Sequence, residues 1–243
     1  MTAPDMAWQA IHASACAPYL QGSRFAWHFA RGKLGRDPVF RGMLERGDLA
    51  GRERVVDIGC GQGLLACLLQ ACRDVGSHWP SGWGPAPVAR SYLGIELMQR
   101  DVRRAERATA GLPLAPRFVC ADMREAELPA CDLVVVLDVL HYVDHDAQNR
   151  LLERIRDALR PCGRLLLRVG DLANARGFAI SQWVDRVVTT VRGHRVPPTW
   201  GRSVADWSAL LRSLGFAVQA VPMSAGTPFA NVLLVADLGE AWA

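Results

Sequence analysis

Residues 55–63 read Val-Val-Asp-Ile-Gly-Cys-Gly-Gln-Gly, and this stretch decides the fold. Two β-branched residues lead into a buried strand, and an acid follows at Asp57. Three glycines then alternate, at Gly59, Gly61 and Gly63. Glycine suits an abrupt turn from strand to helix because it tolerates a positive φ and has no Cβ to keep a ligand from the backbone. The apolar run that follows is expected to be a helix, whose first turn offers free N–H groups to an anionic ligand group such as a carboxylate.

The spacing of this turn resembles the first motif of the class I S-adenosylmethionine-dependent methyltransferases. The pattern is G-x-G-x-G with an acid two residues before the first glycine. Dinucleotide-binding domains use G-x-G-x-x-G, and Leu64 stands where that third glycine would be. The resemblance implies S-adenosyl-L-methionine as cofactor, bound at Asp57, Gly59, Cys60, Gly61 and Gly63. Asp57 either orients the turn, reaches the cofactor ammonium through water, or caps the loop by accepting backbone N–H bonds.

Segments typical of strands and helices alternate along the chain, which predicts a parallel sheet covered by helices. Strands are expected at residues 55–58, 92–96, 117–120, 133–137 and 165–169, and helices at 64–72, 98–110, 146–159, 172–191 and 204–214. Pro161 and Gly163 are expected to stop a helix and turn the chain. Residues 216–221 and 231–236 look like the terminal antiparallel hairpin of the methyltransferase sheet. The expected fold is therefore α/β and Rossmann-like, with seven mostly parallel strands, that hairpin, and helices on both faces.

At 243 residues the chain is expected to be one domain, large enough to bury a good core. Residues 51–243 are expected to form the S-adenosylmethionine-binding methyltransferase domain. Residues 1–50 precede it and are expected to form one or two helices, as an N-terminal cap or lid. Two interpretations stay open for this segment: a cap that covers an exposed strand edge, or a lid that faces the substrate.

In an open parallel sheet, ligands bind outside the carboxyl ends of the strands. The second expected strand ends at Glu96, where the family's second motif places a carboxylate that accepts hydrogen bonds from the ribose hydroxyls. Leu97 follows it and is counted with the cofactor-binding residues. The alternative is a surface acid that begins a helix and is favoured by the helix dipole.

The third expected strand is followed by Ala121-Asp122-Met123. In the family, an acid at this position accepts from the adenine amino group, and the next backbone N–H meets a ring nitrogen. Asp122 and Met123 match that pattern. The alternative is that Asp122 is the N-cap of a helix over residues 124–128.

The fourth expected strand ends in Leu137-Asp138-Val139-Leu140-His141-Tyr142. This segment resembles the Val-Leu-His-aromatic run of small-molecule methyltransferases, which implies that the backbone at Leu137 and Asp138 lies near the sulfonium end of the cofactor. His141 is the candidate general base, since an imidazole titrates near neutrality. Tyr142 is a second catalytic candidate through its hydroxyl. Packing roles for both side chains are the alternatives.

Composition and motifs exclude several classes of site. The seven cysteines show no C-x-x-C pair, and no Cys/His/Asp cluster suggests a metal, so no metal site is expected. A net charge of +4 and the absence of an RNA-binding aromatic motif disfavour nucleic acid as a partner. No run of about 18 apolar residues and no secretory signal stand in the chain, so a cytoplasmic protein without a membrane span is expected. The Asn/Asp-Pro-Pro-aromatic motif of amino-methylating enzymes is missing after the fourth strand.

A second resemblance concerns the acceptor. Residues 24–34, Arg-Phe-Ala-Trp-His-Phe-Ala-Arg-Gly-Lys-Leu, and Asp37-Pro38-Val39-Phe40 look like the methyltransferases of bacterial aryl-polyene and xanthomonadin-type pigment pathways. That resemblance implies a small aromatic or polyene-precursor acceptor, free or presented on a carrier protein. Three alternatives stay open: an RNA methyltransferase, a noncatalytic S-adenosylmethionine-binding module, and a nicotinamide-dependent oxidoreductase. The acceptor atom and the oligomeric state do not follow from the sequence.

Overall fold

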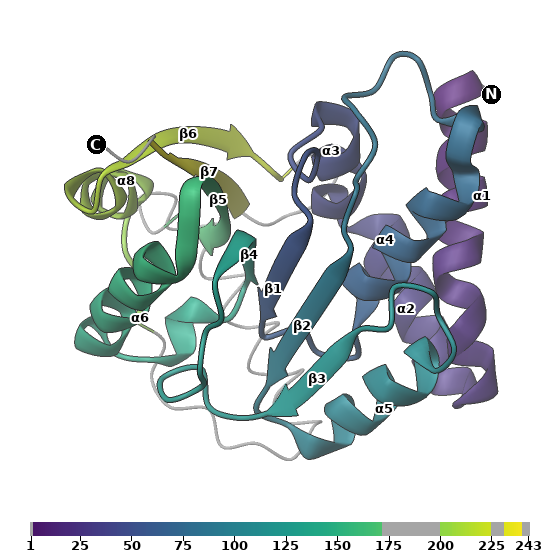
Figure 1. The fold of residues 1–243 in the computed structure, drawn as a ribbon, viewed down its shortest axis with the longest axis horizontal. Helices are drawn as coiled ribbons and strands as arrows, with labels where there is room; N and C mark the ends of the chain where they lie inside the picture. Colours follow the sequence, from purple (N-terminus) through teal and green to yellow (C-terminus); the bar gives the residue numbers. More distant parts are fainter. Residues whose placement is uncertain (1, 172–199, 225–230, 240–243) are drawn as a thin grey trace. The chain divides into compact units, whose positions relative to one another are not determined.

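The computed structural model describes residues 2–171, 200–224 and 231–239 (Figure 1). Within them, seven strands form one sheet in the order β3-β2-β1-β4-β5-β7-β6. The strands are β1 (Arg54–Ile58), β2 (Ser91–Glu96), β3 (Arg117–Cys120), β4 (Cys131–Leu137), β5 (Leu159–Gly170), β6 (Phe216–Pro222) and β7 (Asn231–Leu238). β1 pairs with β2 and β2 with β3 in parallel, whereas β7 pairs antiparallel with both β5 and β6. The Rossmann-like fold with its C-terminal antiparallel hairpin is confirmed.

The chain divides into two compact units, each with its own helices. The first unit comprises Met1–Glu127 and Cys131–Leu133, and the second comprises Leu128–Ala130 and Val134–Ala243. Helices of the first unit are α1 (Ala3–Cys16), α2 (Arg24–Arg36), α3 (Pro38–Arg46), α4 (Leu64–Val75) and α5 (Gln99–Thr109), with short 3-10 segments η1 (Ala17–Gln21) and η2 (Gly76–His78). The described helices of the second unit are η3 (Leu140–Tyr142), α6 (His145–Ala158) and α8 (Val204–Ser213).

The N-terminal segment holds three α-helices and a 3-10 segment, so the expectation of one or two helices was too low. Prolines explain the extra breaks, because Pro18 and Pro38 stand in the first turn of η1 and of α3, where a missing N–H costs nothing. α1 packs against both α2 and α4 (Figure 1). Whether residues 1–50 act as a lid stays a prediction.

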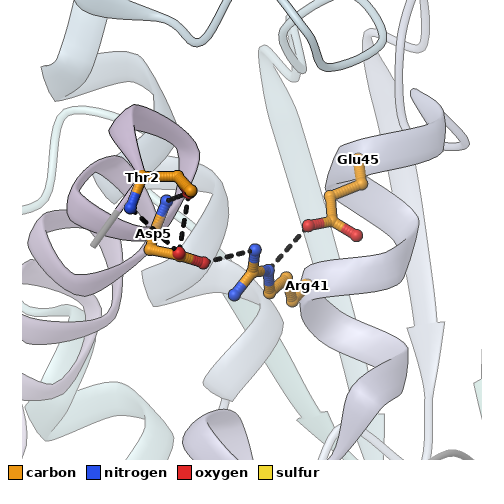
Figure 2. A network of polar contacts seen from close by, with 4 residues as sticks. All are labelled: Thr2, Asp5, Arg41 and Glu45. Atoms are coloured by element: carbon orange, nitrogen blue, oxygen red, sulfur yellow. Dashed lines mark hydrogen bonds and ion pairs between the residues drawn. The ribbon is translucent and has the colours of Figure 1, made fainter.

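Figure 2 shows how polar side chains join α1 to α3. Thr2 and Asp5 form a capping box at the start of α1. Arg41 of α3 donates to Asp5 Oδ1 at 3.0 Å and to Glu45 Oε1 at 2.7 Å. These side chains are more than a third exposed at Asp5 and Glu45, so the network fixes geometry more than it adds stability.

β5 differs from the prediction. It begins at Leu159 and runs to Gly170, whereas the sequence was expected to turn at Pro161 and Gly163. The irregularity is a single residue, Cys162, whose φ of 60° interrupts the extended backbone without ending the strand. The expected helix over residues 172–191 lies outside the described residues.

The helix expected over residues 204–214 is confirmed as α8. Ser203 and Asp206 form a capping box at the start of α8. Gly215 follows the helix with a φ of 89°, as expected for a residue that ends a helix. None of the described helices is both long and apolar enough to cross a membrane.

Candidate functional site

The glycine turn between β1 and α4 has the geometry that its sequence predicts. Gly59, Gly61 and Gly63 have φ values of 75°, 55° and 75°, in the left-handed region that side chains with a Cβ rarely enter. The N–H groups of Gly59 and Cys60 both donate to the carbonyl of Ile95, at 2.8 and 3.2 Å. The turn is therefore attached to the end of β2. A Cβ built on Gly61 would meet no atom within 4 Å, so the backbone there lies beside open space.

Glu96 ends β2 and faces this turn. Its Oε2 accepts from the N–H of Gly61 at 2.9 Å, and its Oε1 accepts from the N–H of Met98 at 2.9 Å. Burial raises the pKa of this half-buried carboxyl, and those two backbone donors oppose the shift. Each oxygen has a second lone pair, so the carboxylate can still accept from two hydroxyl groups. The sequence offered Glu96 as a ligand residue or as an acid that begins a helix, and the structure shows that it also holds the glycine turn in place.

Asp57 lies buried beneath the turn, at 5% exposure. Its Oδ2 accepts from the Tyr92 hydroxyl at 2.5 Å. Burial raises the pKa of Asp57 to about 7, against the lowering effect of the Tyr92 bond, and the nearby Glu96 charge raises it further. Within the described residues, the carboxylate accepts from no backbone N–H of the turn and pairs with no basic side chain. The alternative in which Asp57 caps the loop is therefore wrong, and the acid is left without a counter-charge.

Cys60 contributes backbone to the turn and packs its side chain below it. A Cβ built on Gly94 would lie 2.7 Å from Cys60 Sγ and 2.6 Å from Phe118 Cδ1, so only glycine fits beneath the thiol. Burial raises the pKa of the Cys60 thiol well above its ordinary value. The side chain is a buried packing residue, as its sequence context predicts.

Tyr19 is a contributor that sequence reasoning missed. This buried residue of η1 donates its hydroxyl to the carbonyl of Gln62 at 2.8 Å, so the N-terminal segment contacts the glycine turn directly. No local signal marks it, because the two residues are 43 positions apart.

Asp122 and Met123 follow β3 in a turn. The N–H of Ala121 donates to the carbonyl of Glu96 at 3.0 Å, which joins the ends of β2 and β3. Asp122 accepts from the backbone N–H of Arg124 at 2.8 Å and takes its guanidinium on both oxygens, at 2.6 to 3.0 Å. No helix follows at 124–128, so the N-cap alternative is wrong. The guanidinium of Arg124 is therefore bound to the carboxylate that was expected to accept from the adenine amino group.

Two apolar side chains stand exposed beside these acids. Leu97, next to Glu96, is 62% exposed, and Val119 of β3 is 40% exposed. Cys120 Sγ lies 3.4 Å from the Leu97 carbonyl, so the two strand ends that carry them are in contact. This arrangement gives the first unit an uncovered apolar surface at the ends of β2 and β3, where a flat aromatic ligand group can pack.

The second unit carries the residues that follow β4. Asp138 has a φ of 60°, a strained conformation for a residue with a side chain, and Leu137 before it is half-buried. Arg168 of β5, at 1% exposure, donates from Nε to Asp138 Oδ1 at 2.7 Å and pairs with Oδ2 through Nη2. The Asp138 N–H also donates to the Arg168 carbonyl at 3.3 Å. The sequence singled out Asp138 but gave no sign of its ion pair.

His141 and Tyr142 lie in η3, which begins two residues after Asp138. Their rings are 4.2 Å apart, and the carbonyl of His141 accepts from the N–H of Trp200 at 2.8 Å. Burial lowers the pKa of His141, and the charge of Asp138 partly opposes this. The imidazole is therefore neutral near pH 7 and able to accept a proton.

Comparison with known proteins places this geometry in a family. A family model for O-methyltransferase domains matches residues 23–217. The mitomycin biosynthesis 6-O-methyltransferase of Streptomyces lavendulae is 29% identical over 186 residues, which cover 74% of this chain and 46% of that protein. The chain thus spans about half the length of this curated relative.

Solved structures share the fold. An O-methyltransferase family protein from Burkholderia thailandensis superposes with a TM-score of 0.64 and 18% identity, over 88% of this chain and 58% of that one. Human N-acetylserotonin methyltransferase in complex with S-adenosylmethionine gives a TM-score of 0.60 and 20% identity, over 87% of this chain and 54% of that one. At these identities the likeness concerns the fold alone.

Proposed function

The chain belongs to the O-methyltransferase family, and from this premise we propose that it transfers a methyl group from S-adenosyl-L-methionine to an oxygen atom of a small molecule. The family match confirms the methyltransferase resemblance found in the sequence. The single observation that carries the proposal is the glycine turn held by Glu96 over a buried, uncompensated Asp57. That combination provides backbone, hydrogen-bond acceptors and negative charge for a cationic adenosyl ligand.

The residues of the first unit fit the cofactor by chemical type. The cofactor carries a cationic sulfonium and an ammonium, and it supplies an electrophilic methyl carbon. Asp57 and Glu96 both have pKa values raised by burial, so a cation brought near them would be stabilised. The open space beside the Gly61 backbone leaves room for close approach of the ligand, and we assign Gly59, Cys60 and Gly63 to the same turn of the cofactor site.

The adenosine part is assigned to the ends of β2 and β3. Glu96 has free lone pairs for the two ribose hydroxyls. Leu97 offers an exposed apolar side chain to the purine. Asp122 would accept from the adenine amino group and Met123 would donate its backbone N–H, provided that the Arg124 guanidinium moves off the carboxylate.

The second unit is assigned the chemical step. Removal of the acceptor hydroxyl's proton by neutral His141 would make its oxygen a better nucleophile, and Tyr142 beside it would hold that oxygen by a hydrogen bond. The backbone at Leu137 and Asp138 is assigned to the methyl-donor end. Positioning of two reactants contributes about 7–11 kcal/mol in well-oriented reactions, so alignment carries most of the rate and the base adds to it.

The acceptor that we propose is an aromatic or polyene-precursor hydroxyl, free or carrier-bound. Support comes from the family, whose activity is O-methylation, and from a relative that acts in mitomycin biosynthesis. The exposed aromatic ring of Phe25 in α2, at 63% exposure, adds to that support.

Calorimetry and a transfer assay test the proposal together. The protein should bind S-adenosylhomocysteine and ignore NADH. With methyl-labelled cofactor, it should then label phenolic hydroxyls in a panel that also holds amines, thiols and RNA. Binding of NADH without S-adenosylhomocysteine would overturn the proposal, and so would labelling confined to amines or RNA.

A further inference from the structure

Gln62 stands inside the glycine turn, between Gly61 and Gly63, and has an unusual side chain. The residue is 2% exposed, and neither its Nε2 nor its Oε1 has a hydrogen-bond partner in the described residues. A buried amide without partners costs about 1–3 kcal/mol. Buried polar groups are nearly always paired, so such an exception requires an explanation.

The backbone of Gln62 is fixed, so the amide cannot escape by a shift of the turn. The Tyr19 hydroxyl holds its carbonyl at 2.8 Å, and the flanking glycines have φ values of 55° and 75°. Rotation about the bonds of the side chain itself is the remaining freedom. That rotation moves the amide relative to the turn while the backbone stays in place.

We infer that Gln62 is a further cofactor-binding residue, whose amide takes the zwitterionic amino-acid end of the adenosyl cofactor. This inference rests on the proposed function. The Nε2 group donates to the carboxylate and Oε1 accepts from the ammonium, so one amide meets both charges. Glu96 cannot take this part, because a carboxylate accepts only and would repel the ligand's own carboxylate.

The amide also complements Asp57, which lies buried below the same turn. Asp57 is an acid without a basic partner, so it favours the ammonium and disfavours the carboxylate of the ligand. A neutral donor at Gln62 is the group that lets the carboxylate come close despite that negative charge. Asp57 then stabilises the ligand's ammonium, and the Gln62 amide binds both the ammonium and the carboxylate.

Two ligands and two matched substitutions test this role by calorimetry. S-adenosylhomocysteine has the amino-acid end, and 5′-methylthioadenosine lacks it. Gln62→Met keeps the length of the side chain and removes the amide, and Gln62→Glu keeps an acceptor but removes the donor. Both substitutions should weaken the binding of S-adenosylhomocysteine about tenfold, which is about 1.4 kcal/mol. The affinity for 5′-methylthioadenosine should stay within about twofold of the wild-type value.

Gln70 is the control, because it is an equally buried glutamine of the same unit with a satisfied amide. It donates to Asp74 at 2.8 Å and accepts from the N–H of Leu114 at 3.0 Å. In the unliganded protein, Gln62→Met should raise the melting temperature, whereas Gln70→Met should lower it and leave the affinity ratio of the two ligands unchanged. An unchanged ratio in both folded Gln62 variants would overturn the inference. Failure of the wild type to bind either ligand would instead overturn the proposed function.

Discussion

Two aspartates lie at the carboxyl ends of strands, Asp57 within β1 and Asp138 directly after β4, and their surroundings differ. Asp57 in the first unit is buried, accepts one hydroxyl from Tyr92 and has no basic partner in the described residues. Asp138 in the second unit is neutralised by the buried guanidinium of Arg168. Within the described residues, the carboxylate of one aspartate thus has no cationic partner, whereas the carboxylate of the other is paired with a guanidinium. The difference supports the proposed cation site in the first unit, whereas the second unit has an internal ion pair at a residue of strained backbone.

Removal of the internal cation should have the largest effect. Arg168→Met leaves Asp138 charged beside a buried apolar residue, and breaking a buried pair from one side costs about 3–5 kcal/mol. Because the Asp138 side chain is 30% exposed, we expect about 3 kcal/mol, measured by urea unfolding. Arg164→Met, which breaks the more exposed pair with Asp237, is the matched control and should cost less. If both variants lose the same free energy of unfolding, the Arg168 pair is no more important than an exposed ion pair, and Asp138 does not depend on it.

Replacement of Asp57 should instead stabilise the protein, by an amount that depends on pH. Its folded pKa of about 7 lies above the ordinary 3.8, so the folded state binds more protons between those values. Stability should fall as pH rises from about 4 to about 7, and the full penalty of up to about 4 kcal/mol stays above that. Asp57→Asn should therefore be more stable than the wild type at pH 8, and this advantage should shrink at pH 5. Urea unfolding at both pH values checks it, and a pH-independent difference would contradict it.

His141→Gln tests the chemistry assigned to the second unit. Turnover should fall about 100-fold, with cofactor affinity within about twofold. Because burial lowers the His141 pKa below its ordinary 6.5, the wild-type rate should be level above pH 6.5 and fall in more acidic solution as the base takes a proton. A flat profile of rate against pH would count against the base.

Glu96→Ala tests the ribose role in the first unit. Loss of both carboxylate oxygens should weaken the binding of S-adenosylhomocysteine about tenfold, or about 1.4 kcal/mol, as measured by calorimetry. Since Glu96 also accepts from Gly61 and Met98, a melting curve must show that the variant stays folded. Glu53→Ala removes an exposed acid that pairs with Arg90 and should leave affinity unchanged.

Arg124→Met should give the smallest change, and it is a gain. Its guanidinium is 56% exposed, so its pair with Asp122 stabilises by about 0.2–1 kcal/mol. If the adenine amino group binds the Asp122 carboxylate, freeing that carboxylate from Arg124 should increase the affinity for S-adenosylhomocysteine up to about fivefold. Arg156→Met breaks the similar exposed pair with Asp157 and serves as control. Unchanged affinity in both variants would show that Asp122 does not bind adenine.

Local sequence predicted the elements because their signals lie within a few residues. The glycine turn, the Ser203 cap and the strand over residues 117–120 all depend on backbone preferences or on side chains that bond their own neighbours. The near-continuous apolar runs likewise predicted the central strands, because β1 and β4 are buried along almost their whole length. Where a local signal misled, at Pro161 and Gly163, β5 already begins at Leu159, and its pairing with β7 starts at Arg164, directly after them.

What the sequence by itself determined is the strand–turn–helix with its acids, and hence the ligand class. What only the tertiary structure decided is the state of those acids. Tyr92 reaches Asp57 across 35 residues, Tyr19 reaches Gln62 across 43, and Arg168 reaches Asp138 across 30. Such partners have no local signature, because packing of distant elements selects them. Since burial and the nearest charge set a carboxyl's pKa, the chain order alone cannot tell an open acid from a neutralised one.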